Sequence, residues 1–426
     1  MDSSLFLVLA TIALAFQTLT IYLFLFEPGL EYRISKRPKI PSASDDCIPV
    51  LEALSSSPTY KQNKIEVLTN GEAYYEAELA SIQEAIHSIH LEAYIFNKGR
   101  LTKRFLAALT ERARAGVAVR VVADAIGNFL TPDSYFDELR NAGGKVCWYH
   151  PFRLHLIPRL NNRTHRELII IDGKVGFIGG SGFADHWAYG KNGHPAWRDT
   201  MVRVTGPAVR GLQATFTENW LESSGEIITC KDCFPELKPA GDVTAFVVDS
   251  SPSAGRSTRS RIVFQTLLAC ASKSIAIATP YFLPDAGARK EMIDAVKERG
   301  VKIRIITPGH KSDHLLTRHS SRRIYGDLLQ AGIRIFEYQP SMMHAKIMVI
   351  DDVCSIVGST NFDNRSFGLN DETNLIGFDR ALAERLLEDF ERDIANSEEI
   401  TLEKWKKRPI AEKVFENAGR ILERQQ

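Results

Sequence analysis

The sequence lacks an excess of charge of either sign, which limits the kind of partner it can have. Its 426 residues include 53 Lys and Arg against 52 Asp and Glu, a formal net charge of +1. A protein whose main partner is DNA or RNA usually carries a basic surplus that neutralises phosphates. The near-neutral balance therefore argues against a nucleic acid as the main partner.

Cysteine is also scarce, and its spacing argues against a zinc site. The six cysteines are Cys47, Cys147, Cys230, Cys233, Cys270 and Cys354. Only Cys230 and Cys233 lie close together, and no second pair or His-rich segment completes a ligand set. We expect this pair to lie in an unlinked loop rather than in a metal or redox site, and most of the cysteines to be reduced.

One long hydrophobic run is present, near the N-terminus. Leu5 to Phe26 contains no charged residue, and at about 1.5 Å per helical residue it can cross a hydrocarbon core of about 30 Å. The preceding MDSS has no Lys or Arg and carries Asp2, which is unlike a cleaved secretory signal. The sequence therefore predicts a transmembrane helix at residues 5–26.

Basic residues follow this helix and none precedes it. They are Arg33, Lys36, Arg37 and Lys39. The positive-inside rule then predicts a single-pass protein of the inner (cytoplasmic) membrane, with its N-terminus outside and its body in the cytoplasm. Residues 27–60 are rich in Pro and Ser and are expected to form an irregular linker that lets the body lie close to the bilayer.

The rest of the chain consists of two similar units, predicted at residues 61–240 and 241–400. The segments at 81–96, 105–124 and 136–149 have counterparts at 261–284, 291–309 and 325–338. Each unit alternates short apolar runs with amphipathic stretches, the pattern of an α/β fold whose helices cover a mostly parallel sheet. The sequence predicts two copies of one α/β domain.

The two units also share a motif whose residues could take part in catalysis. HRELIIID at 165–172 and HAKIMVID at 344–351 each place a His before an apolar strand that ends in Asp, and a bend rich in small residues follows each one. Side chains two residues apart on a strand share a face, so His344 and Lys346 point the same way. An anion that meets one of them meets both.

This doublet resembles the His-x-Lys-x4-Asp signature of the phospholipase D superfamily. The second copy fits the signature in full, whereas the first has Glu167 in place of Lys. The segments WRDT (197–200), TPYFLPD (279–285), GSTNFDNRSF (358–367) and EKWKKRP (403–409) are similar to those of bacterial cardiolipin synthases. The resemblance covers nearly the whole chain after about residue 50.

The resemblance implies two α-β-α sandwich domains with one active site at their interface. His165 would form a covalent phosphohistidine, and His344 would protonate the leaving oxygen. The other implied roles are imidazole orientation by Asp199 and Glu372, phosphate binding by Lys346 and Asn361 with help from Ser359, and structural hydrogen bonding by Asp172 and Asp351. The superfamily's chemistry requires no metal and no cofactor.

The implied function is that of a membrane-anchored phosphatidyltransferase which joins two phosphatidylglycerols into cardiolipin and releases glycerol. The alternatives are a phospholipase D-type hydrolase of phospholipids, a nuclease of the same superfamily, and a non-catalytic lipid-binding relative. The anchor favours a phospholipid substrate.

Glu167 is the main departure from the superfamily pattern, because an ionised carboxylate would repel a nearby phosphate. Three interpretations are open. Arg163, two residues before His165, neutralises Glu167 and replaces the missing Lys. Glu167 binds a hydroxyl of the substrate, such as that of a glycerol headgroup. Or the first half of the site is inactive.

The C-terminal residues 401–426 alternate apolar and basic side chains, and we expect an amphipathic helix there. Such a helix can pack on the protein body or lie on anionic lipid. Packing on the body is the favoured interpretation.

Overall fold

The computed structural model describes residues 3–25, 34–44, 46–152, 161–190, 193–252, 258–409, 412–413 and 416. The first repeat contains β1 (Tyr60–Thr69), α3 (Asn70–Glu84), β2 (Ser88–Ala93), α4 (Arg100–Arg114), β3 (Ala118–Asp124), α5 (Asp137–Asn141), β4 (Lys145–Tyr149), β5 (Arg163–Thr164), β6 (Leu168–Ile171), β7 (Val175–Gly179), α6 (Asp185–Ala188), β8 (Thr200–Thr205) and α7 (Val209–Ser224). The second contains β9 (Val243–Ser250), α8 (Arg259–Cys270), β10 (Ser274–Ala278), α9 (Ala286–Arg299), β11 (Lys302–Pro308), α10 (Leu315–Gln330), β12 (Arg334–Tyr338), β13 (Ile347–Ile350), β14 (Cys354–Gly358), α11 (Asn364–Gly368), β15 (Asn370–Phe378), α12 (Arg380–Ala395) and β16 (Ser397–Ile400).

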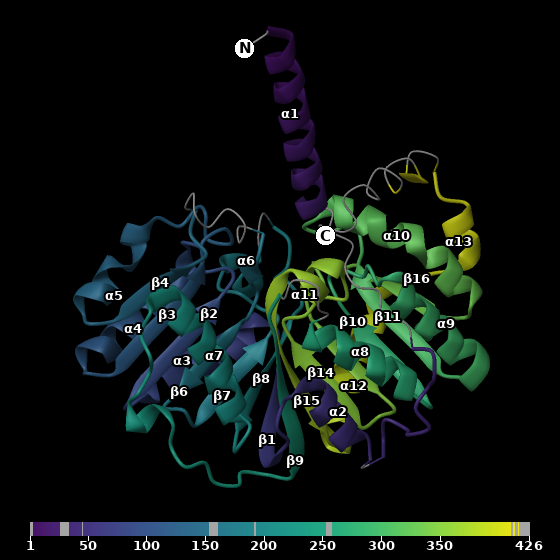
Figure 1. The fold of residues 1–426 in the computed structure, drawn as a ribbon. Helices are drawn as coiled ribbons and strands as arrows, with labels where there is room; N and C mark the ends of the chain where they lie inside the picture. Colours follow the sequence, from purple (N-terminus) through teal and green to yellow (C-terminus); the bar gives the residue numbers. More distant parts are fainter. Residues whose placement is uncertain are drawn as a thin grey trace.

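The predicted N-terminal apolar helix is present as α1 (Ser3–Leu25). It is long and apolar enough to cross a membrane, and the stretch Ser3–Thr20 has none of its residues buried against the rest of the protein. Figure 1 shows α1 projecting away from the body as an isolated rod. An apolar helix without protein neighbours is what a membrane-spanning segment requires.

The segment after α1 is fastened to the second repeat. Arg37 forms ion pairs with Glu291, Asp294 and Glu298 of α9. The chain then forms α2 (Cys47–Ser55), which packs on α8 and buries Cys47 and Leu51. The expectation of an irregular linker over 27–60 is therefore wrong for its later part. Pro49 lies in the first helical turn, where a proline has no intrahelical hydrogen bond to break.

The strands of both repeats join in one sheet, 16-stranded within the described residues, through the antiparallel pairing of β1 with β9. The order β8-β7-β6-β2-β3-β4 in the first half matches β15-β14-β13-β10-β11-β12 in the second. The matching orders confirm the predicted internal repeat.

The prediction of mostly parallel sheets is wrong in detail, because only the outer part of each half is parallel. β2, β3 and β4 are parallel to one another, as are β10, β11 and β12. The motif strands form the hairpins β6–β7 and β13–β14, which are antiparallel. A turn of a few residues can connect only antiparallel neighbours, so each motif imposes this mixed topology.

Helices and strands stack in alternating layers, which agrees with the predicted α/β class. One core lies between α3, α4 and the first half of the sheet, and another lies between α8, α9, α10 and the second half. A third core contains α7, α12 and strands of both repeats. Figure 1 shows the two halves side by side, with α6 and α11 near the boundary between them. The shared core fixes the two repeats against each other.

Asp172 and Asp351 close equivalent turns at the ends of β6 and β13. The carboxylate of Asp172 accepts hydrogen bonds from the backbone N–H groups of residues 86–88, and that of Asp351 accepts from residues 272–274. Both residues have positive φ, 52° and 54°, a conformation that Asp tolerates better than most residues. Each carboxylate ties its hairpin to the start of the adjacent strand, β2 or β10.

The C-terminal segment is only partly helical where it is described. α13 (Leu402–Lys406) has five residues, and Trp405 donates a hydrogen bond through Nε1 to the Arg322 carbonyl of α10 at 2.7 Å. This contact places α13 on the body. Most of the rest of the amphipathic helix predicted at 401–426 lies outside the described residues.

One pair of cysteines differs from the prediction made from the sequence. Cys230 and Cys233 are joined by a disulfide, so the interpretation of this pair as an unlinked loop is wrong. The spacing of three residues lets the two sulfur atoms meet within one turn. The other four cysteines are free.

Candidate active site

The two motif histidines lie at the starts of β6 and β13, at the edges where β2 and β10 end. His165 and His344 are largely buried, with side chains 12% and 8% exposed. Their apolar strands, LIII and IMVI, are buried on both faces and hold the backbone in place. Each histidine is thus a polar residue at the end of a rigid strand.

Each histidine is paired with a carboxylate from the other repeat. Nδ1 of His165 lies 3.1 Å from both carboxylate oxygens of Glu372, and Nδ1 of His344 lies 2.7 Å from Oδ2 of Asp199. A carboxylate at Nδ1 fixes the ring and its tautomer and leaves Nε2 for chemistry. The predicted orienting residues are both in position, and the pairing crosses between repeats.

Backbone pairing between the repeats produces this exchange. The His344 N–H donates to the carbonyl of Arg198 at 2.7 Å, and the His165 N–H donates to that of Asp371 at 2.9 Å. Each histidine therefore lies beside the residue that immediately precedes its carboxylate partner. The Arg198 side chain adds an ion pair to Asp393 of α12 at 2.9 Å. The WRDT segment is thereby fastened to the second repeat.

Lys346 supplies the positive charge at the centre of the site. Its Nζ lies 2.8 Å from Nδ1 and 3.1 Å from Nε2 of His344, and it donates to the carbonyls of His344 at 2.9 Å and Gly180 at 3.3 Å. Burial lowers the pKa of Lys346, although the nearby carboxyl groups of Asp199, Glu372 and Glu167 oppose the shift. An ammonium group from the second repeat thus faces carboxyl groups from both repeats.

The charge of Lys346 acts on its neighbours. Burial lowers the pKa of His344, and the lysine adds to this effect while Asp199 opposes it. Burial raises the pKa of Asp199, but the hydrogen bond with His344 and the two positive charges outweigh burial and leave that pKa below its ordinary value. The Asp199 carboxylate is therefore ionised at neutral pH.

Gly180 makes room for the lysine. A Cβ at this position would lie 2.7 Å from Cδ of Lys346 and 2.9 Å from Oδ1 of Asp199. The second repeat has Ser359 at the equivalent position after its hairpin. The loss of a side chain in the first repeat therefore creates the space that Lys346 fills.

Glu167 is buried next to this centre, and Arg163 does not neutralise it. Arg163 lies 3.5 Å from Asp124 and donates to the backbone carbonyls of His150 and Asn162. The interpretation of Arg163 as a substitute for the missing lysine is therefore wrong. Thr164 and Arg163 form β5, which pairs with β15 and turns the Arg163 side chain toward β3 rather than toward Glu167.

Burial raises the pKa of Glu167 well above its ordinary value and so favours the neutral acid. Oε1 accepts from the Tyr94 N–H at 3.2 Å, and Oε2 is buried without a hydrogen-bond partner. A neutral acid does not repel a phosphate as a carboxylate would. Burial therefore weakens the repulsion of phosphate that the sequence suggested for Glu167.

Ser359 and Asn361 differ in their hydrogen-bond partners. The Ser359 hydroxyl donates to Oε2 of Glu372, so it is already engaged in holding the partner of His165. Asn361 is buried after β14, and its Oδ1 has no hydrogen-bond partner. Of the two, Asn361 has a buried side-chain oxygen without a hydrogen-bond partner.

Aromatic rings enclose both histidines, and sequence reasoning missed them. The rings of Trp187 and Trp197 lie 5.1 and 5.4 Å from that of His344, and the ring of Tyr94 lies 5.5 Å from that of His165. Trp187 also donates through Nε1 to Asp199 at 3.1 Å. The available signal was the WRDT segment, whose tryptophan stands two residues before Asp199.

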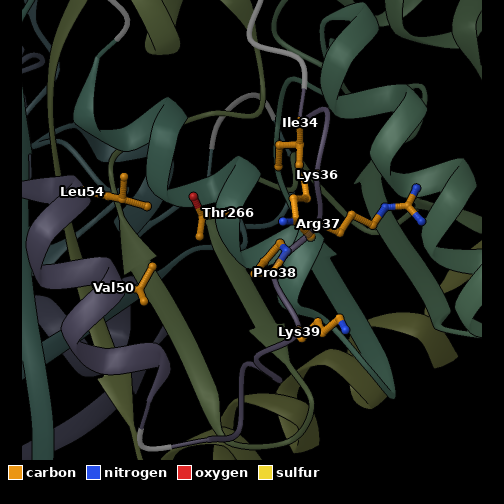
Figure 2. Close-up of a pocket in the computed structure, with 9 residues that line it drawn as sticks. Ile34, Lys36, Arg37, Pro38, Lys39, Val50, Leu54 and Thr266 are labelled. Atoms are coloured by element: carbon orange, nitrogen blue, oxygen red, sulfur yellow. The ribbon is translucent and has the colours of Figure 1, made fainter.

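The described surface also has a separate cavity of about 540 Å³ on the outer side of the second repeat. Figure 2 shows it between residues 34–39, α2 and α8, with Arg37 directed away toward α9. None of the motif residues lines it. Within the described part of the chain, no group of three His, Cys, Asp or Glu side chains is arranged to hold a metal ion.

Comparison with known sequences agrees with this geometry. A sequence profile for "Cardiolipin synthase, PLD-like domain" matches residues 79–220 and 264–394, one segment in each repeat. The chain belongs to the cardiolipin synthase family of the phospholipase D superfamily. Family members include the major cardiolipin synthase ClsA of Bacillus subtilis, 34% identical over 368 residues that cover 85% of this chain and 75% of the relative. A cardiolipin synthase of Alkalihalophilus pseudofirmus is 34% identical over 376 residues, which cover 87% of this chain and 73% of that protein.

Solved structures confirm the fold of this family member. The phosphatidylserine synthase of Haemophilus influenzae superposes with a TM-score of 0.68 at 14% identity, over 90% of this chain and 100% of that chain. The polyphosphate kinase of Porphyromonas gingivalis gives a TM-score of 0.53 at 12% identity, over 93% of this chain and 58% of the other. The family fold thus extends over both repeats.

Proposed function

We propose that this protein is a phosphatidyltransferase that forms cardiolipin from two phosphatidylglycerols through a phosphohistidine. The observation that carries the proposal is the pair of buried histidines, each held at Nδ1 by a carboxylate of the other repeat, with Lys346 beside them. Relatives named cardiolipin synthase support the choice of substrate and product.

In the first half-reaction, Nε2 of His165 attacks the phosphorus of one phosphatidylglycerol. The bond from phosphorus to the oxygen of the terminal glycerol breaks, and that oxygen takes a proton from Nε2 of His344. Glycerol leaves, and a phosphatidyl group remains on His165. Glu372 stabilises the positive charge on the attacking ring, and Asp199 does the same for the protonated ring of His344.

In the second half-reaction, a hydroxyl of the second phosphatidylglycerol attacks the same phosphorus. The now neutral His344 accepts the proton of that hydroxyl as the bond from phosphorus to His165 breaks. Cardiolipin leaves, and both imidazoles return to their first states. The same histidine thus serves as acid and then as base.

Lys346 and Asn361 are proposed to contact the phosphoryl oxygens. Lys346 is the ammonium group closest to Nε2 of His344 among the described residues, and it offsets charge that builds on the phosphate. Glu167, as a neutral acid with an open Oε2, is proposed to donate to a substrate oxygen where the family's first lysine would stand. Ser359 is proposed to position Glu372.

The test is to incubate the purified full-length protein with phosphatidylglycerol and identify the products by mass spectrometry. We expect cardiolipin and glycerol in equal amounts. Phosphatidic acid with glycerol would indicate the hydrolase instead. Absence of any turnover, with lipid still bound, would indicate the non-catalytic relative.

We further propose that the body lies in the cytoplasm. Four basic residues follow α1 and none precedes it, which supports this orientation. The Cys230–Cys233 disulfide opposes it, because the cytoplasm keeps most protein thiols reduced.

External protease added to intact spheroplasts should therefore leave the body uncut, and lysis should expose it. Digestion of the body in intact spheroplasts would place it outside.

A further inference from the structure

Large apolar side chains are exposed on loops at the edge of the sheet where the motif histidines lie. We define the apolar rim as Phe129, Leu130, Phe152, Tyr189, Leu315 and Leu316. Phe129 and Leu130 are the most exposed of these, at 79% and 83%. Single exposed apolar residues are common on folded proteins, but several of them on one side of a molecule indicate an interaction surface.

The rim residues come from loops at one edge of the sheet. Phe129 and Leu130 follow β3, Phe152 follows β4, and Leu315 and Leu316 begin the helix after β11. His165 and His344 lie at these same edges of their repeats, and the two histidines share one site. The carboxyl edges of both repeats therefore open toward one side of the molecule.

A few contacts between neighbouring residues connect the rim to the two histidines. In the first repeat, Asn128, next to Phe129, donates to the carbonyl of Tyr94 at 2.9 Å, and the Tyr94 ring contacts His165. At the second histidine, Tyr189 is two residues from Trp187, which contacts His344. Rim residues of the first repeat are therefore linked to both histidines through neighbouring residues.

Asp313, two residues before Leu315, accepts a hydrogen bond from the Tyr281 hydroxyl at 2.8 Å and influences the charge of both His344 and Lys346. At the other end of the rim, the guanidinium of Arg100 lies over the Tyr189 ring, 4.3 Å from its centroid. A tyrosine under a cation suits the boundary between lipid tails and charged headgroups.

We propose that the apolar rim inserts into the surface of a phospholipid bilayer and opens the active site directly onto the membrane. The inference rests on the proposed function, because it requires a phospholipid substrate. In this arrangement the substrate passes from the bilayer to the histidines without entering water. Figure 1 shows α1 on the same side of the body as α6, α10 and α11, so the anchor and the rim face one membrane. A phospholipid bilayer is the occupant that fits both features.

The first test compares two forms of one substrate with the full-length protein in nanodiscs. Leu130→Asp and Leu315→Asp are expected to lower turnover of long-chain phosphatidylglycerol in the bilayer by at least about tenfold, because a buried carboxylate opposes insertion. Turnover of short-chain phosphatidylglycerol, dissolved as monomers, is expected to stay close to wild type. Unchanged turnover in the bilayer, or equal loss with both substrates, would overturn the proposal.

Ile227→Asp is the matched control. Ile227 is 67% exposed, and its neighbour Glu226 pairs with Arg120 and Lys145 at the opposite edge of the sheet. This variant is expected to match the wild type with both substrates. A loss of bilayer activity equal to that of Leu130→Asp would mean that any added surface charge has this effect, and would overturn the proposal.

A second measurement is independent of turnover. A nitroxide on Leu130→Cys, in a Cys147→Ser background, is expected to be more accessible to oxygen than to a water-soluble nickel complex in nanodiscs. The same label on Ile86→Cys, at the far edge, is expected to show the reverse. If the wild type fails to convert phosphatidylglycerol but the Leu130 label lies in lipid, the proposed function fails and the docking surface stands. A Leu130 label in water overturns the docking surface alone.

Discussion

Replacing His165 or His344 with alanine is expected to lower kcat for phosphatidylglycerol by about 10⁴-fold or more, because each variant removes half of a nucleophile and acid pair. The two losses should not add in the double variant, since either one already stops the shared reaction. The measurement is initial velocity of cardiolipin formation by full-length protein in nanodiscs.

His87→Ala is the control, because the His87 side chain is 41% exposed and lies at the opposite edge. It should match the wild type. Near-normal activity of either motif variant would contradict the shared site. Unchanged circular dichroism would show that the fold survives the substitution.

The same variants decide which histidine attacks. A trapped phosphatidyl group is expected on His165 of the wild type, and the His165→Ala variant should carry none. As an acid, His344 must be protonated in the free enzyme, and its pKa is lowered by burial and by Lys346. The value of kcat/KM should therefore fall as pH rises through a pKa below 6.5. A rise over that range, with label on His344, would reverse the two roles.

The second large effect is expected for Lys346→Met, with a loss in kcat of about 10²- to 10³-fold, because the phosphoryl charge loses its nearest cation. This variant should also move the fall of kcat/KM to higher pH, because the lysine charge no longer lowers the pKa of His344. A loss in kcat together with this pH shift distinguishes the loss of the lysine charge from a general distortion of the site.

Glu167→Gln is the matched variant in the first repeat. If Glu167 is neutral, an amide of the same shape should keep activity close to the wild type, since it also offers a donor beside the substrate. A loss as large as that of Lys346→Met would show that Glu167 acts as an ionised carboxylate. Arg163→Met should lower stability rather than kcat, because Arg163 pairs with buried Asp124.

Hydrophobic pattern and motif spacing predicted much of this protein. The apolar runs before Asp172 and Asp351 identify buried strands, because few other arrangements bury four consecutive apolar residues at the end of a motif. The repeated order of these runs predicted two α/β units, and the doublet predicted two histidines with Asp199 and Glu372 as partners. The uncharged N-terminal run predicted α1. Each of these predictions uses residues that lie close together in the sequence.

The contacts between the repeats could only come from the tertiary structure. Which carboxylate holds which histidine depends on backbone pairing between residues more than 140 apart, His344 with Arg198 for one. The parallel content was overestimated because the hairpin at each motif sets strand direction more strongly than the helix-strand alternation does. The position of Arg163 follows from the pairing of β5 with β15, which no local spacing encodes.

The sequence by itself determined the chemical groups, their order and the apolar N-terminal helix, because composition and periodicity act over a few residues. The tertiary structure decided which side chains surround these groups and in which direction burial and nearby charges shift their pKa values. The sequence presents Glu167 as a charged residue, but the fold raises its pKa, because burial removes the water that would stabilise its ionised form. The same is true of the apolar rim, whose residues gather around the site only when the strand edges of both repeats meet there.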